Sequence, residues 1–283
     1  MTTVEISVDR PYYYPGDTVK GNVHVVCDKP QKLRGITLEA LGYERTRITE
    51  STGSGKNRHT HTYISNNFLH RFDLQLLGED ELPRGSYDYP FEYQLPAQAL
   101  PSYHGFYATV VYTVTANVDI PFWFDAHETI ETPVAIPSTQ VTIEHTPATL
   151  YSKNAEDTTR PGFMMTVGRT MFFSGEIIKG NFELTGDGGH RIRKVDVELQ
   201  LVENAVAQGH SRVYNQVISK AQIPGECLAP GAVIPFEICI PPRTSTAYNG
   251  VFSKVWYALS INVDVAWAFD ADASLPVVIL DRA

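Results

Sequence analysis

Cysteine, long apolar runs and clustered positive charge are scarce in this sequence, and each shortage argues against a class of protein. The 283 residues include three cysteines, Cys27, Cys227 and Cys239, which suits free thiols in a reducing compartment better than a disulfide scaffold. No apolar run approaches the length of about 18 residues that a membrane-spanning helix needs. The net charge is −9, without a basic run, which argues against nucleic-acid binding through phosphate neutralisation. The first ten residues lack the regions of a secretory signal, so we expect a cytoplasmic protein.

Catalytic motifs are also lacking, so we expect a protein that is not an enzyme and needs no cofactor. There is no Gly-x-Ser-x-Gly motif, no cysteine with a nearby histidine on a recognisable scaffold, and no catalytic carboxylate pair that the sequence can place. The segment Gly53 to Lys56 is similar to a phosphate-binding loop. However, Glu50 replaces its first glycine, Asn57 follows the lysine, and no helix is expected after it. We interpret the segment as a flexible hairpin tip.

Alternation of apolar and polar residues with a period of two is abundant. The clearest stretch runs from Tyr103 to Asp125, where the even positions from Val110 onward are apolar. Such alternation is typical of a long β-strand with one buried face. The pattern returns 145 positions later, from Tyr248 to Asp270, with 9 of 23 aligned residues identical. A repeat of this size predicts two copies of one domain.

Further repeats support the duplication. Residues 14–25 resemble residues 173–184, and residues 33–44 resemble residues 192–203, both at an offset of 159. The motif Pro90 to Glu92 matches Pro235 to Glu237 at the smaller offset of 145. The second copy is therefore 14 residues shorter, and we expect the first copy to carry the longer hairpin, around Ser51 to Asn57.

Frequent turn signals and the lack of convincing helical periodicity predict an all-β fold with two tandem β-sandwich domains, residues 1–137 and 138–283. Four glycines recur at equivalent places in the two copies. We predict that Gly16, Gly21, Gly175 and Gly180 lie in turns that need a positive φ.

Four basic residues cluster on the long hairpin of the first copy: Arg45, Arg47, Lys56 and Arg58. In an acidic protein, such a cluster could meet phosphorylated or acidic protein tails or lipid headgroups. The alternative is a solvated loop whose charges keep a strand edge from aggregating. Partner tails could also add as a strand to an exposed sheet edge, although the sequence does not indicate which edge.

The pair His59 and His61 is a weak candidate for a metal site, because alternate residues of a strand face the same side. A transition-metal site needs a third or fourth ligand. Position 65 is Ser, and His70 is the only nearby addition. We favour a solvent-exposed hairpin without a metal, and keep a metal- or sugar-binding sandwich as a lesser alternative.

The order and spacing of the motifs resemble the arrestin clan, and its α-arrestin branch most of all. The motifs that carry this resemblance are Tyr14-Pro15-Gly16-Asp17, Leu82-Pro83 with Gly85, Tyr89-Pro90-Phe91, Leu100-Pro101-Ser102 and Asp119-Ile120-Pro121-Phe122-Trp123. Each motif alone is unspecific, but their order and their duplication cover nearly the whole chain.

The resemblance implies two immunoglobulin-like β-sandwiches, the arrestin fold, and a cytoplasmic adaptor. Family members bind cytoplasmic tails of membrane proteins and link them to endocytic, sorting or ubiquitination machinery. Peripheral association with the endosome or plasma membrane is a further option, and nothing points to nucleic acid. Two family features are not found: the PPxY motifs that recruit ubiquitin ligases, and a polar core of paired Arg and Asp. A scaffold similar to the arrestin-like retromer subunit, or to bacterial sporulation-control proteins, is therefore the alternative.

Overall fold

The computed structural model describes residues 2–53, 55–122, 124–136, 147–152, 160–242, 244, 247–266 and 270–280. The regular elements in these ranges are β-strands and two single turns of 3-10 helix, η1 (Gly55–Asn57) and η3 (Gly225–Cys227), with no α-helix. The prediction of an all-β protein is therefore confirmed. Nothing helical in the described ranges has the length and apolarity of a membrane-crossing segment.

The chain divides into two compact units. Unit 1 consists of Met1–Ile136 together with two segments from later in the sequence, Ala205–Arg212 and Asn249–Ser253. Unit 2 consists of Pro137–Asn204, Val213–Tyr248 and Lys254–Ala283. The predicted domain boundary, between residues 137 and 138, lies outside the described residues.

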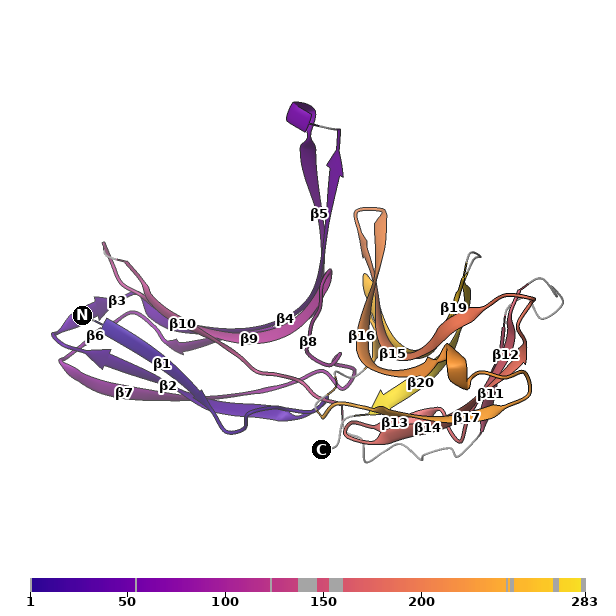
Figure 1. The fold of residues 1–283 in the computed structure, drawn as a ribbon. Coiled ribbons are helices and arrows are strands. Elements are labelled where there is room, and N and C mark those ends of the chain that lie inside the picture. The colour runs from indigo at the N-terminus through magenta and orange to yellow at the C-terminus, as the bar shows by residue number, and fades with distance from the viewer. Residues whose placement is uncertain are drawn as a thin grey trace. The chain divides into compact units, whose positions relative to one another are not determined.

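Unit 1 is built of two layers of antiparallel strands (Figure 1). One layer has the order β1–β2–β7, and the other has the order β10–β9–β4–β5, with β8 beside β9. The strands are β1 (Thr2–Val8), β2 (Thr18–Cys27), β3 (Gln31–Leu33), β4 (Gly35–Thr52), β5 (His59–Leu77), β6 (Asp80–Leu82), β7 (Gly85–Gln94), β8 (Tyr103–His104), β9 (Ala108–Asp119) and β10 (Ala126–Glu131). Alternate residues such as Val23 and Val25 of β2 and Val114 and Ala116 of β9 are fully buried, so the apolar face of each strand forms the core.

Unit 2 holds most of two further sheets, whose strands β15, β16, β18 and β19 end in the two late segments of unit 1. Their strand orders are β11–β12–β14–β17 and β13–β20–β19–β15–β16, with β18 beside β19. The strands are β11 (Ala148–Tyr151), β12 (Gly162–Val167), β13 (Met171–Phe173), β14 (Ile177–Gly186), β15 (Ile192–Ala207), β16 (His210–Pro224), β17 (Val233–Cys239), β18 (Tyr248–Asn249), β19 (Ser253–Val265) and β20 (Ala271–Leu280). The buried rings of Phe163 and Phe182, 5.7 Å apart, mark its core.

The stretch from Tyr103 to Asp125 is not one continuous strand. It is broken between β8 and β9, where the amide of Gly105 donates to the carbonyl of Ala108 (2.8 Å). The second copy has the same break, because Gly250 donates to Ser253 at the same distance. The prediction of one long strand is wrong at this point. A tight turn of a few residues does not interrupt the alternation of apolar and polar residues around it, so the pattern does not reveal the turn.

The repeated Lys-Gly-Asn and Pro-Phe-Glu motifs are partners of one another across neighbouring strands. The register sets lysine opposite glutamate, glycine opposite phenylalanine and asparagine opposite proline in both units. Lys20 Nζ lies 3.7 Å from Glu92 Oε2, and Lys179 Nζ lies 2.8 Å from Glu237 Oε1. The duplication therefore preserved a cross-strand arrangement as well as two stretches of sequence.

The turn prediction is right for one pair of repeated glycines and wrong for the other. Gly16 and Gly175 have φ of 84° and 82°. Gly21 and Gly180 lie within strands and have no positive φ. A Cβ atom on Gly21 would lie 2.4 Å from Phe91 Cζ, and one on Gly180 would lie 2.4 Å from Phe236 Cζ. These two glycines make room for an aromatic ring across the strand pair.

Candidate functional site

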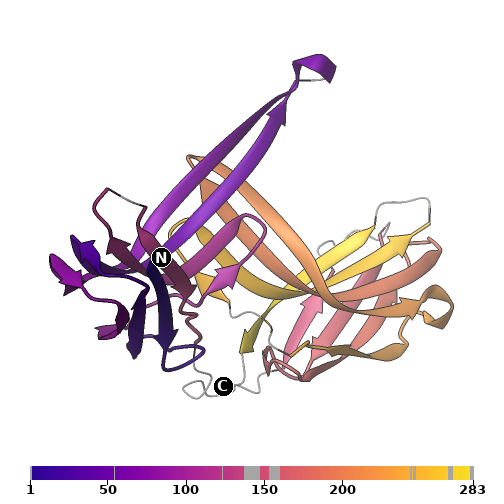
Figure 2. The same cartoon turned by 90° about the vertical axis from the view of Figure 1, so that its left-hand side faces the viewer.

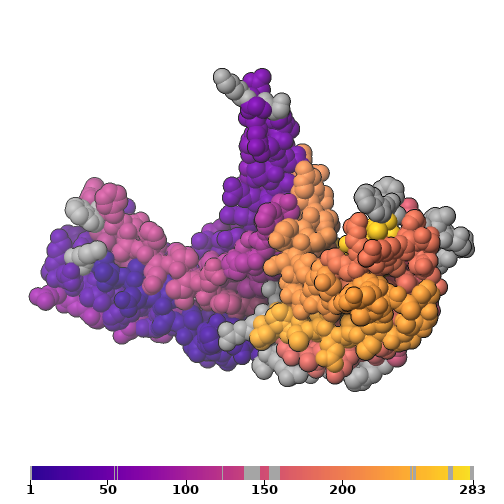
Figure 3. Space-filling view, viewed as in Figure 1, coloured from indigo at the N-terminus to yellow at the C-terminus, as the bar shows by residue number. Residues whose placement is uncertain are grey.

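The β4–β5 hairpin of unit 1 extends beyond the sheet to which it belongs (Figures 1 and 2). Strand β4 pairs with β9 only as far as Thr46 opposite Ala108, whereas β4 and β5 stay paired to Thr52 opposite His59. The outer part is a two-stranded ribbon and forms a narrow projection in the space-filling view (Figure 3). The strands have 18 and 19 residues against 16 and 15 in the β15–β16 hairpin. The prediction of a longer hairpin in the first copy is confirmed.

Three of the four predicted basic residues are exposed along this hairpin. Arg45 and Arg47 are exposed and share one face of β4, because alternate residues of a strand face the same side. The Arg45 guanidinium lies 5.2 Å from the centre of the Tyr43 ring, and its Nε donates to Asn66 Oδ1 (2.8 Å). Arg58 Nη2 donates to Ser51 Oγ (3.2 Å). The side chain of the fourth, Lys56, lies outside the described part of the chain.

The charges of these arginines are not neutralised within unit 1. Among the described residues, none of the three guanidinium groups forms an ion pair with a carboxylate. By contrast, Arg34 and Arg71 of the same unit form ion pairs. Each of these guanidinium groups lies 3.2 Å or less from a carboxylate oxygen. The hairpin therefore presents positive charge that an anionic group could meet.

Apolar side chains accompany the arginines on the same face. Ile64 pairs with Arg47 across the hairpin and is 41% exposed, and Phe68 pairs with Tyr43 and is 72% exposed. Exposed apolar groups next to unpaired guanidinium groups are typical of surfaces that bind proteins. We define the arginine face as Arg45, Arg47, Arg58, Ile64 and Phe68.

The opposite side of the hairpin base holds a buried carboxylate. Glu44 is fully buried. Its Oε1 accepts from the amides of Phe252 (3.0 Å) and Ser253 (2.7 Å) and from Ser253 Oγ (2.7 Å). Its Oε2 accepts from the Val251 amide (2.9 Å) and Asn67 Nδ2 (3.4 Å). All five partners donate, which compensates a buried carboxylate without a cation.

Gly250 allows the turn of residues 250–253 to approach this carboxylate. A Cβ atom at Gly250 would lie 2.3 Å from Glu44 Oε1, closer than any real contact. The segment Asn249–Ser253 belongs to unit 1, so the contact fixes the base of the hairpin within that unit. The amides of Val251, Phe252 and Ser253 form a small anion-binding nest, and the Glu44 carboxylate is the anion that occupies it.

The second late segment of unit 1, Ala205–Arg212, supports the ribbon further out. The Thr46 hydroxyl donates to the Val206 carbonyl (2.6 Å), and the Gln208 amide donates to Ser65 Oγ (3.1 Å). The ring of His210 stacks on Tyr63 with centroids 3.6 Å apart. The carboxylate of Glu50 contacts both His210, at 3.2 Å, and the guanidinium of Arg212. One face of the ribbon is thus occupied, and the arginine face is the one that stays exposed.

The two predicted metal candidates, His59 and His61, lie on the outer ribbon of the hairpin. His59 and His61 are both exposed, and His61 pairs with Glu50 across the hairpin. Within the described ranges, no group of three or more His, Cys, Asp or Glu side chains could hold a metal ion. Neither histidine is brought to a site that would fix a transition metal.

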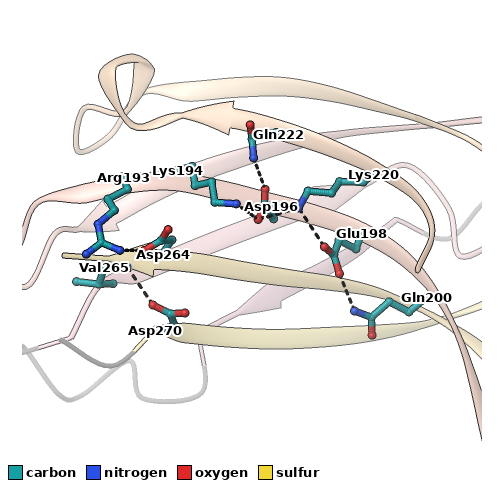
Figure 4. A network of polar contacts seen from close by, with 10 residues as sticks. All are labelled: Arg193, Lys194, Asp196, Glu198, Gln200, Lys220, Gln222, Asp264, Val265 and Asp270. Atoms are coloured by element: carbon teal, nitrogen blue, oxygen red, sulfur yellow. Dashed lines mark hydrogen bonds and ion pairs between the residues drawn. The ribbon is translucent and has the colours of Figure 1, made fainter. Parts of the chain in front are cut away.

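Unit 2 carries a polar network on the face of β15 and β16 (Figure 4). Asp196 is 7% exposed, and its carboxylate receives Lys194 Nζ (2.7 Å), Gln222 Nε2 (2.8 Å) and Lys220 Nζ (2.9 Å). Lys220 also reaches Glu198 at 3.3 Å. Burial raises the pKa of Asp196, but the hydrogen bonds from Lys194, Gln222 and Lys220 outweigh it and lower the pKa to about 2. Both lysines and the glutamine are engaged with carboxylates of the same sheet, so we interpret the network as one that stabilises the sheet.

Sequence reasoning missed Glu44, although a signal was present. Leu38 and Ala40 occupy the core positions of the alternating segment, and Glu44 continues the same series. A charged residue at a core position of a strand is rare unless it is paired. Its partners, Val251 to Ser253, lie about two hundred residues further along, so only the structure identifies them.

Comparison with known proteins places both halves of the chain in one family. The family profile described as "Arrestin (or S-antigen), N-terminal domain" matches residues 2–140. The profile described as "Arrestin (or S-antigen), C-terminal domain" matches residues 163–282. The two matches are consecutive and follow the internal repeat.

Similar curated proteins carry related names. Arrestin domain-containing protein A of Dictyostelium discoideum is 21% identical over 305 residues, covering 97% of this chain and 50% of that protein. Arrestin domain-containing protein 1 of Mus musculus is 26% identical over 125 residues, covering 44% and 27%. The pH-response regulator protein palF/RIM8 of Emericella nidulans is 28% identical over 137 residues, covering 43% and 18%. The chain spans half or less of the length of these relatives. With its tandem N- and C-terminal domains, the chain belongs to the arrestin family.

Proposed function

We propose that this protein is a non-enzymatic arrestin-like adaptor that binds cytoplasmic regions of membrane proteins or sorting machinery, in endocytosis, endosomal sorting or signalling. The two domains are proposed to divide at residues 137 and 138. The arginine face is proposed as the partner-binding surface, together with Lys56 at the hairpin tip. A regulatory scaffold of the retromer-subunit or bacterial sporulation-control kind is the alternative.

One observation carries this proposal: three exposed guanidinium groups without carboxylate partners, in a protein whose net charge is −9. An acidic protein repels anionic peptides over most of its surface, so a local positive face determines where they bind. Guanidinium groups hold phosphate and carboxylate through paired hydrogen bonds. Ile64 and Phe68 add apolar contact beside the charges, which would select tails that combine an acidic or phosphorylated group with an apolar residue.

The test is binding of fluorescently labelled peptides from membrane-protein cytoplasmic tails, phosphorylated and unphosphorylated, measured by anisotropy. The double variant Arg45→Glu/Arg47→Glu should weaken binding of acidic or phosphorylated peptides at least tenfold, roughly the effect of losing a charge-assisted contact. Raising the salt concentration from about 0.1 M to about 0.5 M should weaken wild-type binding in the same direction.

The matched control is Lys32→Glu/Arg71→Glu, which makes the same charge change elsewhere in unit 1. Lys32 and Arg71 already lie beside Glu81 and Glu39, so this variant should bind as the wild type does. An equal loss in both double variants would mean that only net charge matters. No binding by the wild type to any tail peptide would count against an adaptor that uses this face.

A further inference from the structure

The turn between β9 and β10 exposes two phenylalanines to an unusual degree. Phe122 is 99% exposed and Phe124 is 88% exposed, the two highest values among the large apolar side chains of the described residues. Phe122 therefore packs against almost nothing, and it contributes no core contact that would explain its presence. Exposed aromatic side chains that serve no packing role mark surfaces that meet another apolar phase.

The backbone of this turn has two distinctive features. Phe122 has φ of 58°, in the left-handed region that a bulky residue rarely adopts. The carboxylate of Asp125 closes the turn by accepting from the Ile120 amide (3.1 Å). In unit 2, Asp270 accepts from the Val265 amide at the same distance, so the carboxylate belongs to the shared scaffold. Strain of this kind persists where the displayed side chain has a use.

The chemistry of the turn favours a lipid interface over a protein pocket. Pro121 has no backbone N–H, so insertion of the turn into lipid leaves one fewer hydrogen-bond donor without a partner. No groove or neighbouring side chain fixes the orientation of a fully exposed ring. Binding to a shaped protein pocket would therefore cost side-chain conformational entropy, whereas insertion into a fluid lipid interface costs less. Aromatic side chains are favoured where acyl chains meet headgroups.

The charges around the turn indicate which lipid surface it suits. Asp119 and Asp125 flank it, Glu128 follows on β10, and Arg34 is already 3.2 Å from Asp119. These carboxylates would be repelled by the headgroups of an anionic membrane, whereas zwitterionic headgroups carry no net charge to repel them. Attraction must therefore come from apolar insertion alone.

We propose that the β9–β10 turn is a membrane-contact element that inserts Phe122 and Phe124 into the interfacial layer of a zwitterionic, phosphatidylcholine-type bilayer. This role goes beyond the proposed adaptor function and does not depend on the arginine face. Asp119 pairs with Gly35, the first residue of β4, and the arginine face lies towards the other end of that strand. The 18 residues of β4 span roughly 55 Å along the strand, so contact with a bilayer leaves the hairpin tip free.

The experiment is co-flotation of the full chain with phosphatidylcholine vesicles. The wild type should float, and Phe122→Ser/Phe124→Ser should lower the partition coefficient at least tenfold, because the insertion of two aromatic side chains is lost. Wild-type binding should change less than about twofold between 0.1 M and 0.5 M NaCl, because no ion pair is involved. The double variant should unfold at the wild-type temperature, since the replaced rings make no core contact.

The matched control is Phe68→Ser, which removes another exposed aromatic ring of unit 1. This variant should float as the wild type does, and it should lose tail-peptide affinity if the arginine face binds tails. Wild-type protein that stays with the soluble fraction would overturn the proposal, as would equal loss in the control. Binding that needs phosphatidylserine and disappears in 0.5 M NaCl would also overturn it, and so would capture of a protein through these two rings without vesicles. The peptide assay is separate, so the two proposals can fail independently.

Discussion

Several internal contacts recur at equivalent positions of the two units. The pair Arg34 and Asp119 in unit 1, 3.2 Å apart, recurs as Arg193 and Asp264 in unit 2, 3.0 Å apart. The carboxylates of Asp125 and Asp270 close equivalent turns at 3.1 Å. The shared contacts join strands that are distant in sequence. Both copies therefore kept the same long-range contacts after the duplication.

The hairpins at equivalent places differ. The β15–β16 hairpin closes with a two-residue turn, Gln208 and Gly209, which have φ of 51° and 85°. Such a turn matches the right-handed twist of its strands. The β4–β5 hairpin closes through η1 and carries the arginine face. Positions at which two duplicated copies differ are not needed for the fold that both copies share. We therefore propose that the function of unit 1 lies on its longer hairpin.

The largest expected effect comes from removing the buried carboxylate at the base of the longer hairpin, a contact that fixes this hairpin and not the shorter one. Glu44→Ala should destabilise the protein by about 4 kcal/mol, because it leaves several buried donors without an acceptor. Urea unfolding gives the size of the effect. Hydrogen exchange locates it, since the amides of Val251, Phe252 and Ser253 should lose protection.

The control for this variant is Glu39→Ala on the same strand. The Glu39 carboxylate is 40% exposed and pairs with Arg71 at 3.2 Å, an arrangement that contributes less than about 1 kcal/mol. If the three amides kept their wild-type protection in Glu44→Ala, the buried carboxylate would not be what fixes the hairpin base.

The next test asks whether the shared contacts are equally important in both units. Gly21→Ala and Gly180→Ala should each cost about 3 kcal/mol, because the new methyl group meets a phenylalanine ring and a backbone carbonyl. The control Gly186→Ala, where no atom lies within 4 Å of the added Cβ, should be near neutral. Urea unfolding measures all three. A cost in one unit and not in the other would show that the repeated register is not equally constrained.

Much of the fold was predictable from alternation, because a period of two assigns each residue to a face. It predicted an all-β chain and, through its return later in the chain, the duplication. The change of the repeat offset from 159 to 145 predicted the longer hairpin of the first copy, to which the basic residues Arg45 and Arg47 were assigned. What alternation does not provide is the register between strands. Gly21 was misassigned to a turn because its partner, Phe91, lies 70 residues further along the sequence.

The candidate site was only partly predictable for the same reason. The basic residues could be identified from composition along one hairpin. The nest that holds Glu44 could not, because its donors come from a segment that joins unit 1 from the far end of the chain. The exposure of Phe122 was also hidden, since an apolar residue that continues an alternating pattern looks like part of the core.

The smallest predicted effect concerns a contact present in unit 2 alone. The position equivalent to Asp196 in unit 1 is Thr37, so the carboxylate stabilised by two lysines and a glutamine has no counterpart at that place in unit 1. Its pKa falls from 3.8 to about 2 in the folded state, and a lowered pKa adds stability above the unfolded pKa that disappears as the pH falls through the folded one. Asp196→Asn should therefore cost about 2 kcal/mol at pH 7 and progressively less between pH 4 and pH 2. Hydrogen exchange of peptides from β15 and β16, compared with peptides from β4 and β5, assigns the loss to one unit. A difference between variant and wild type that stayed constant down to pH 2 would exclude the carboxylate charge as its cause, and a loss shared by both units would remove the contrast between them.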